Sequence, residues 1–343
     1  MGCMESKEKR PGINKLKRTA GYLIRSIALI VAIIAINFVL VHVMPGDPLM
    51  HILGDEQYFT LLNQFPEQLE EIRQQYSLDG NILEQFVRYL KQVVTLQFGH
   101  SYINGESVVK TVLFRMRWTV TLSMCAIVIS AIIGGSLGVL AGYHKGGKLD
   151  SGLTAVFLFL ETIPANCLAL ILLVIFSYKL RWFPVGGMVS GGLKGFARFL
   201  SVLHHMVLPV LVLSLFRTSS NFLLMKSYVS QIREEDYITV AVAKGISRTH
   251  VLFRHVLRNV LVPFVTTICL QIGHILSGSM LIEVVFSWKG MGTLIYDAVN
   301  NRDYPTVQMC LLLVAVCVVL FNFIADMLCM YIDPRIQDGM KNE

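Results

Sequence analysis

Long stretches without any charged residue are the feature of this sequence that most restricts its fold. Four apolar runs contain no Asp, Glu, Lys or Arg, and two more contain a single charged residue each. Each run is long enough to cross the ~30 Å hydrocarbon core of a bilayer, which takes about 20 helical residues. The uncharged runs are 26–46, 118–143, 259–282 and 304–325, whereas 151–178 contains Glu161 and 203–225 contains Arg217.

We expect every run to be a helix, because a chain that crosses lipid must satisfy its backbone hydrogen bonds internally. None of the runs alternates as a barrel strand would. The predicted fold class is therefore an all-α polytopic membrane protein with six transmembrane helices. Composition agrees, since 54% of the 343 residues are hydrophobic and only 15% are charged, against about 25% in soluble domains. These features exclude a cytosolic enzyme, a secreted disulfide scaffold and a disordered chain.

Charges beside the runs predict the orientation of the chain. Six Lys or Arg residues and two Glu lie within the first 18 residues, and the positive-inside tendency places such a segment in the cytoplasm. Six spans return the C-terminus to the same side, so both termini of this cell-membrane protein are expected inside. The net charge of +7 follows mainly from this topology, and no nucleic-acid partner is needed. Four basic residues at 179–202, in a loop placed outside, are not explained by it.

The segments follow one another in a simple order, with one long polar region near the start. Within that region, residues 67–73 and 84–91 carry apolar side chains at helical spacing, which predicts a small helical cap outside the membrane. The predicted divisions are a basic N-terminus at 1–21, transmembrane helix 1 at 22–44, an extracytoplasmic cap at 45–117, a permease core of five helices at 118–332 that includes a cytoplasmic loop at 226–259, and a cytoplasmic tail at 333–343.

The cytoplasmic loop at 226–263 is too long and too regular to be a plain connection. Apolar residues recur at helical spacing on both sides of Gly245, and glycine tolerates the left-handed conformation in which many helices end. We therefore predict two short helices, joined at residues 245–247 and running parallel to the membrane. Ser247 or Thr249 is expected to cap the second helix.

The same loop is similar to a known family. Its small residues, followed by an apolar patch and a proline, resemble the EAA loop of ABC importer permeases, and an Asp-Tyr pair before them resembles the dipeptide/oligopeptide/nickel branch. The matching residues are Asp236, Tyr237, Ala241, Ala243, Lys244, Gly245 and Pro263.

Five further motifs of that branch occur in the family's order along nearly the whole chain. Six motifs in order are far more specific than any single one. The chain departs from the pattern in a diluted alanine triplet at 240–243 and an extended N-terminus. The five stretches are Pro45-Gly46-Asp47-Pro48, Phe98-Gly99-His100-Ser101-Tyr102, residues 283–292 with Glu283, Phe286, Gly290 and Gly292, Arg302-Asp303-Tyr304-Pro305, and Asp333-Pro334-Arg335.

The resemblance implies a type I ABC importer permease fold and a division of labour between subunits. The cytoplasmic helices would dock on an ATP-binding subunit through residues 236–245, and two such subunits would bind ATP and Mg²⁺. A second homologous permease and an extracytoplasmic solute-binding protein would complete the importer. This chain has no GxxxxGK[ST] motif, so the resemblance implies no cofactor, metal or catalytic residue of its own.

Two charged residues within the spans have both a functional and a structural interpretation, because an ionisable group in a membrane faces a partner or a cavity. Arg217 would bind a substrate carboxylate, form a gate ion pair, or pair structurally with another helix. Glu161, one turn before Pro164, would pair with Arg217 or bind an amine. Pro164 itself either opens the helix towards the path or makes a packing kink.

Uncharged polar residues leave similar alternatives. Gln271 and His274 share one helix face and would either hydrogen-bond between helices or line the path. Glu283, near a span end, is a further candidate for the path, but interface capping and hydrogen bonding between helices are the favoured interpretation. Small-residue spacing at Gly134, Gly135 and Gly138 favours tight helix packing.

Other classes of function fit the sequence less well. An intramembrane enzyme needs a nucleophile–base pair or a metal set, and no recognisable pairing is present. Secondary transporters often carry internal repeats, and none is visible in the sequence. The substrate stays open among dipeptides, oligopeptides, nickel and metallophore complexes, with peptides preferred as the commonest assignment in the family.

Overall fold

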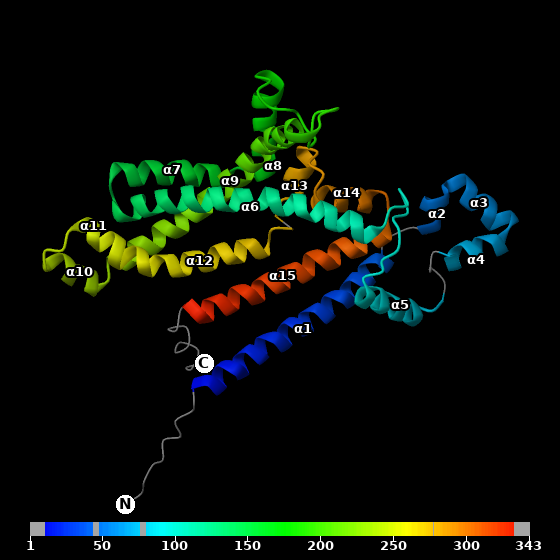
Figure 1. Ribbon diagram of the computed structural model, residues 1–343, viewed down its shortest axis with the longest axis horizontal. Coiled ribbons are helices and arrows are strands. Elements are labelled where there is room, and N and C mark those ends of the chain that lie inside the picture. Colours follow the sequence, from blue (N-terminus) through cyan, green and yellow to red (C-terminus); the bar gives the residue numbers. More distant parts are fainter. Residues whose placement is uncertain (1–10, 44–47, 76–79, 277, 333–343) are drawn as a thin grey trace, which may run out of the picture.

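Long helices, packed side by side, make up most of the protein (Figure 1). The computed structural model describes residues 11–43, 48–75, 80–276 and 278–332. Within these ranges no β-strand forms beyond an isolated bridge between His100 and Ser107. The longest helices are α1 (Pro11–Val43), α6 (Val108–Tyr143), α9 (Gly195–Arg233), α12 (Leu257–Gly273) and α15 (Tyr304–Ile332).

Four helical stretches are long and apolar enough to cross a membrane: Val108–Tyr143, Gly195–Arg233, Arg248–Gly273 and Tyr304–Ile324. A fifth candidate is a bent pair formed by α7 (Lys148–Thr162) with α8 (Ala165–Leu172) and the π-helix η1 (Leu173–Lys179). Its axis turns by 96° at the break before α8, which confirms that Pro164 interrupts the helix. In α1 the apolar part described is the shorter stretch Leu23–Val39. The chain is thus a helical membrane protein, and the count of six spans stays a prediction.

Helices α6 and α9 are in direct backbone contact along a row of glycines. A Cβ added to Gly134 or Gly138 would lie 2.7 Å from a carbonyl oxygen of α9, and one on Gly142 would lie 2.8 Å from another. Only hydrogen fits in that space, so the small-residue interpretation of Gly134 and Gly138 is confirmed. In lipid, such close approach is what holds helices together, since lipid tails are as apolar as the side chains themselves.

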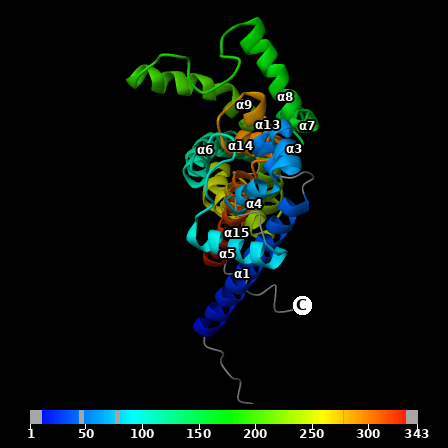
Figure 2. The same cartoon turned by 90° about the vertical axis from the view of Figure 1, so that its right-hand side faces the viewer.

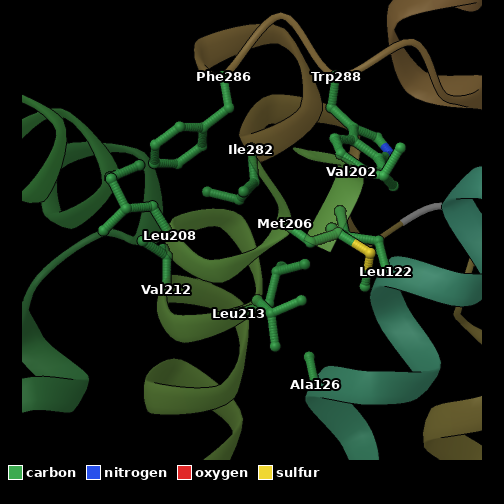
Figure 3. Close-up of a cluster of buried hydrophobic side chains, with 12 residues drawn as sticks. Leu122, Ala126, Val202, Met206, Leu208, Val212, Leu213, Ile282, Phe286 and Trp288 are labelled. Atoms are coloured by element: carbon green, nitrogen blue, oxygen red, sulfur yellow. The ribbon is translucent and has the colours of Figure 1, made fainter. Parts of the chain in front are cut away.

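A buried cluster joins this helix pair to the segment that follows α12 (Figure 3). Figure 3 shows Phe286 and Trp288 above side chains of α6 and α9, such as Leu122 and Met206. Trp288 is fully buried, and its ring meets that of Trp118 edge to face at 6.0 Å. Residues 280–292, which include α13 (Met280–Val285), are therefore part of the core and not a surface loop.

The polar segment after α1 forms four helices, α2 (Pro48–Leu53), α3 (Asp55–Gln64), α4 (Pro66–Gln75) and α5 (Ile82–Thr95). The helices predicted at 67–73 and 84–91 are confirmed as α4 and α5. The first three share a small core that contains Leu49, Tyr58, Leu61 and Leu69. Figure 1 places them at the end of the molecule opposite α10 (Asp236–Ala243) and α11 (Arg248–Val251).

Several sequence motifs lie outside the described residues. These are the basic residues up to position 10, Pro45-Gly46-Asp47 and Asp333-Pro334-Arg335. The orientation of the termini and the boundaries of the predicted segments therefore stay predictions.

Candidate functional site

The cytoplasmic loop begins with helix α10, and the end of this helix follows the sequence prediction closely. Gly245 has φ +76°, the left-handed conformation that glycine adopts without strain. The Gly245 amide donates to the Val242 carbonyl at 3.0 Å, and the Ile246 amide donates to the Ala241 carbonyl at 3.3 Å. This pair of bonds is a Schellman motif, which fixes the direction in which the chain leaves the helix.

The second half of the loop differs from the prediction. Ser247 caps the next helix as expected, since its side chain accepts a hydrogen bond from the His250 amide. That helix, however, is not a separate short one. From α11 it continues through the π-helix η2 (Leu252–Val256) into α12, as one helical stretch over Arg248–Gly273. Residues 248–262 contain no Gly or Pro, so nothing stops the helix before it enters the membrane.

Helix α10 is anchored to the ends of the spans by a hydrophobic cluster. Ile238 and Ala241 are buried there against Val251 and Val256 of the following helix and Val229 of α9. The small size of Ala241 therefore serves packing within the chain. The opposite side of the loop is open: the exposed residues there are Asp236, Tyr237, Val240, Val242, Ala243, Lys244 and Gly245.

Tyr143, at the end of α6, ties this loop to two spans. Its hydroxyl donates to the Arg248 carbonyl at 2.9 Å, and its own carbonyl accepts from Arg233 at the end of α9, at 2.7 Å. Beside it, Lys226 of α9 forms an ion pair with the buried Asp150 of α7. Sequence reasoning missed this junction, because no local pattern marks contacts between residues about 90 positions apart.

Gln271 belongs to a polar network between helices. Its amide nitrogen donates to Asn221 of α9 at 2.7 Å, and Asn221 in turn donates to Ser130 of α6 at 3.2 Å. Such a chain of bonds satisfies polar groups that lipid cannot. His274 lies three residues further on, at the end of α12, with an exposed side chain.

Glu161 and Arg217 are not paired with each other. Among the described residues no ion pair joins them, and Glu161 instead accepts a hydrogen bond from Ser220 of α9 at 3.4 Å. Arg217 is half-buried one turn away on the same helix, with its guanidinium close to Gly278. A carboxylate (Glu161 of α7) and a guanidinium (Arg217 of α9) therefore both lie beside α9 without forming an ion pair with each other.

Glu283 is fully buried and faces hydrogen-bond donors of its own chain. Thr119 donates to it at 2.7 Å, Ser279 at 2.9 Å and the Gly292 amide at 2.7 Å. A Cβ on Gly290 would lie 2.4 Å from the carboxylate. Residues 283–292 therefore fold back on themselves: Gly290 and Gly292 leave space for the Glu283 carboxylate, and this carboxylate binds the Gly292 amide.

Two other motifs meet in space. Asp303, at the start of α15, accepts hydrogen bonds from the Ser101 hydroxyl at 2.5 Å and the Tyr102 amide at 3.2 Å. Thr306 donates to the same carboxylate at 2.7 Å. The two stretches are about 200 residues apart in sequence, and together they fasten the loop before α6 to α15.

Comparisons with known proteins agree with the motifs. The family described as binding-protein-dependent transport system inner membrane component matches residues 134–338, and its N-terminal counterpart matches residues 16–124. The di/tripeptide transport system permease protein DppB of Pseudomonas aeruginosa is 32% identical, covering 88% of this chain and 93% of its own. The dipeptide transport system permease protein DppB of Escherichia coli K12 is 30% identical, covering 92% and 98%. The oligopeptide transport system permease protein AppB of Bacillus subtilis is 32% identical, covering 93% and 99%. The chain therefore belongs to the binding-protein-dependent transport permeases, the membrane components of ABC importers of the peptide type.

Proposed function

We propose that this chain is the membrane-spanning subunit of an ATP-driven importer that carries di- or oligopeptides into the cell. The observation that carries the proposal is the cytoplasmic loop, in which α10 is fixed to two spans and leaves one face exposed. The names of the peptide-permease relatives support the substrate class.

The importer would contain three kinds of partner subunit besides this chain. A second homologous permease forms the transport path with this chain by alternating access at their interface. Two ATP-binding subunits bind ATP and Mg²⁺ on the cytoplasmic side and supply the hydrolysis. A solute-binding protein delivers the peptide from outside. Both termini of this chain lie in the cytoplasm, and the chain itself binds neither cofactor nor metal.

In this proposal, the exposed face at 236–245 docks on an ATP-binding subunit. A force on α10 passes to α9 and α12 through the cluster around Ile238 and Val256, and to α6 through the Tyr143 bonds. Such transmission requires stiff elements with two discrete arrangements, and the helix contacts described above provide the stiffness.

The transport path in this proposal follows α9. Glu161 of α7 offers an acceptor beside Ser220 of α9, and Arg217, one turn before Ser220, offers a cation; such a set suits the amine, the amide groups and the carboxylate of a peptide. His274 extends the same set. Gln271 and Glu283 take part in hydrogen bonds within the chain and contribute to the path only through the shape they maintain.

The experiment that tests the proposal is reconstitution of the complete complex in liposomes, with ATP hydrolysis and peptide uptake measured together. Gly245→Val should lower uptake per ATP several-fold, because a β-branched residue at φ +76° distorts the helix end. The control is Gly54→Val, which also places a β-branched residue at a positive φ (+81°), on the opposite side of the molecule. Equal uptake per ATP in both variants would remove the coupling role.

Substrate class is tested separately with the partner solute-binding protein. Titration calorimetry with dipeptides, longer peptides and Ni²⁺ chelates should give heat of binding with peptides. Binding of nickel or of a metallophore complex alone would leave the importer mechanism intact and overturn the peptide assignment.

A further inference from the structure

Helix α5 has the most regular amphipathic pattern in the polar segment that follows α1. At 100° per residue, its apolar side chains fill one continuous arc, and its polar side chains fill the rest. The polar residues are Glu84, Gln85, Arg88, Lys91, Gln92 and Thr95. A soluble helix of this kind buries its whole apolar arc against a core.

Only one half of the arc is buried. Phe86 and Tyr89 pack against Phe38 of α1, with ring centroids 5.1 Å and 5.8 Å apart. The Tyr89 hydroxyl also accepts a hydrogen bond from Asn37 at 2.9 Å. These contacts fix the position and rotation of α5 on the outer end of α1.

The other half of the arc is uncovered. It consists of four residues at helical spacing, which we call the outer stripe: Leu83, Val87, Leu90 and Val94, with exposed fractions of 70%, 63%, 36% and 83%. No side chain among the described residues hides them, although they are as apolar as the buried half. Nothing in the described part of the chain therefore covers the outer stripe.

The position of α5 along α1 indicates what covers the outer stripe. The uncharged run that begins in α1 continues in the sequence to Gly46, and Phe38, the residue that meets α5, lies eight residues before that end. Helix α5 thus lies beside the apolar run of α1, towards its end, and within reach of lipid. Figures 1 and 2 show it lying across the outer end of α1 and not extending it. On α1 itself, the apolar residues Ile36 and Val39 on either side of this contact are exposed as well.

We propose that α5 is an interfacial helix, which lies in the outer membrane–water boundary with the outer stripe inserted among the acyl chains of the lipid. Its polar face, with Arg88 at the centre and Lys91 at the edge next to the stripe, then meets headgroups and water. A strongly amphipathic helix lying flat, apolar on one side and charged on the other, is the form that binds a bilayer surface. The helix would hold α2–α4 close to the membrane beside α1.

The test is site-directed spin labelling of the complete complex in liposomes of phosphatidylethanolamine and phosphatidylglycerol. Single labels at Val87 and Val94 should relax several-fold more with oxygen than with a water-soluble nickel chelate. Labels at the polar-face positions Lys91 and Thr95 should show the reverse order. The native cysteines must first be replaced, and the measurement needs neither ATP nor transport.

Two results would overturn the proposal. Preference for the nickel chelate at Val87 and Val94 would place the stripe in water, and exclusion of both reagents would mean that a protein covers it. If the cysteine-free chain does not accumulate, a photoreactive amino acid at Val94 in the wild-type background gives the same decision, through a lipid adduct or a protein adduct. Because the test requires only membrane insertion, failure of the peptide-import proposal would not affect it.

Discussion

Removal of the Glu283 carboxylate should prevent the protein from folding, and this expectation follows from three hydrogen bonds. Thr119, Ser279 and the Gly292 amide all donate to it inside a site with no solvent access. The Thr119 hydroxyl has a second role, because it also accepts a hydrogen bond from the Met291 amide at 2.7 Å. Glu283→Ala would leave three buried donors without an acceptor.

The size of the effect can be estimated from these contacts. An unsatisfied buried donor costs about 1–3 kcal/mol, so three of them in Glu283→Ala cost at least ~3 kcal/mol. That is a large part of the 5–15 kcal/mol by which a folded domain is typically stable. Glu283→Gln keeps one of the two acceptor oxygens and replaces charge-assisted hydrogen bonds by neutral ones. This change weakens the site by about 1–2 kcal/mol.

The assay is the yield of assembled complex, its thermal midpoint and the uptake per assembled complex. We expect Glu283→Ala to be lost before assembly, and Glu283→Gln to assemble with a lower midpoint and nearly normal uptake. The control is Glu106→Gln, an exposed acid that accepts a single hydrogen bond from Thr111 at 3.1 Å. A Glu283→Ala complex with wild-type yield and midpoint but no uptake would refute the structural role and place the carboxylate on the transport path.

Three other substitutions give independent checks. Gly138→Ala should lower the thermal midpoint, because the new Cβ would lie 2.7 Å from an α9 carbonyl oxygen and overpacking costs about 1–3 kcal/mol. The control is Gly152→Ala, at a helical site with open space around it, which should leave the midpoint unchanged or raise it. Asp150→Asn should lower the midpoint more than Asp150→Asn combined with Lys226→Met does, since a partly buried cation without its partner is worse than no pair. Asp303→Asn should speed limited chymotrypsin cleavage at Phe98 or Tyr102, in the loop that Asp303 fastens, and an unchanged cleavage rate would contradict its fastening role.

Sequence reasoning succeeded where the cause is local. Uncharged runs predict long helices because lipid allows little else, and the left-handed turn at Gly245 follows from a glycine between two periodic segments. The helical propensity of residues 67–73 and 84–91 was readable for the same reason. Each of these features depends on neighbours within one or two helical turns.

The remaining features depend on partners far away in the chain. Hydrogen bonding is the favoured interpretation of Glu283 and agrees with the structure, but the sequence does not identify the donors, which include Thr119, 164 residues earlier. Likewise, depth alone allows a pairing of Glu161 with Arg217, whereas Glu161 accepts a hydrogen bond from Ser220 instead. After Ser247 the sequence predicts a short surface helix followed by a separate span, whereas the structure has one continuous helical stretch. The hydrophobic pattern does not distinguish a surface helix from the first turns of a span.

On the proposed function, the contacts of α9 explain how a docking loop can act on a transport path. Its inner end carries the cluster that holds α10, its middle carries Arg217 and Ser220, and its glycine contacts bind it to α6 over several turns. A tilt imposed at the inner end must therefore move α6 and the polar residues with it, because carbonyl oxygens and glycine Cα atoms leave no gap to absorb the motion. The bent α7–α8 pair has no such row of contacts, and its 96° break offers a place for the chain to yield. On the proposed function, movement should therefore appear between α8 and α9 and not between α6 and α9.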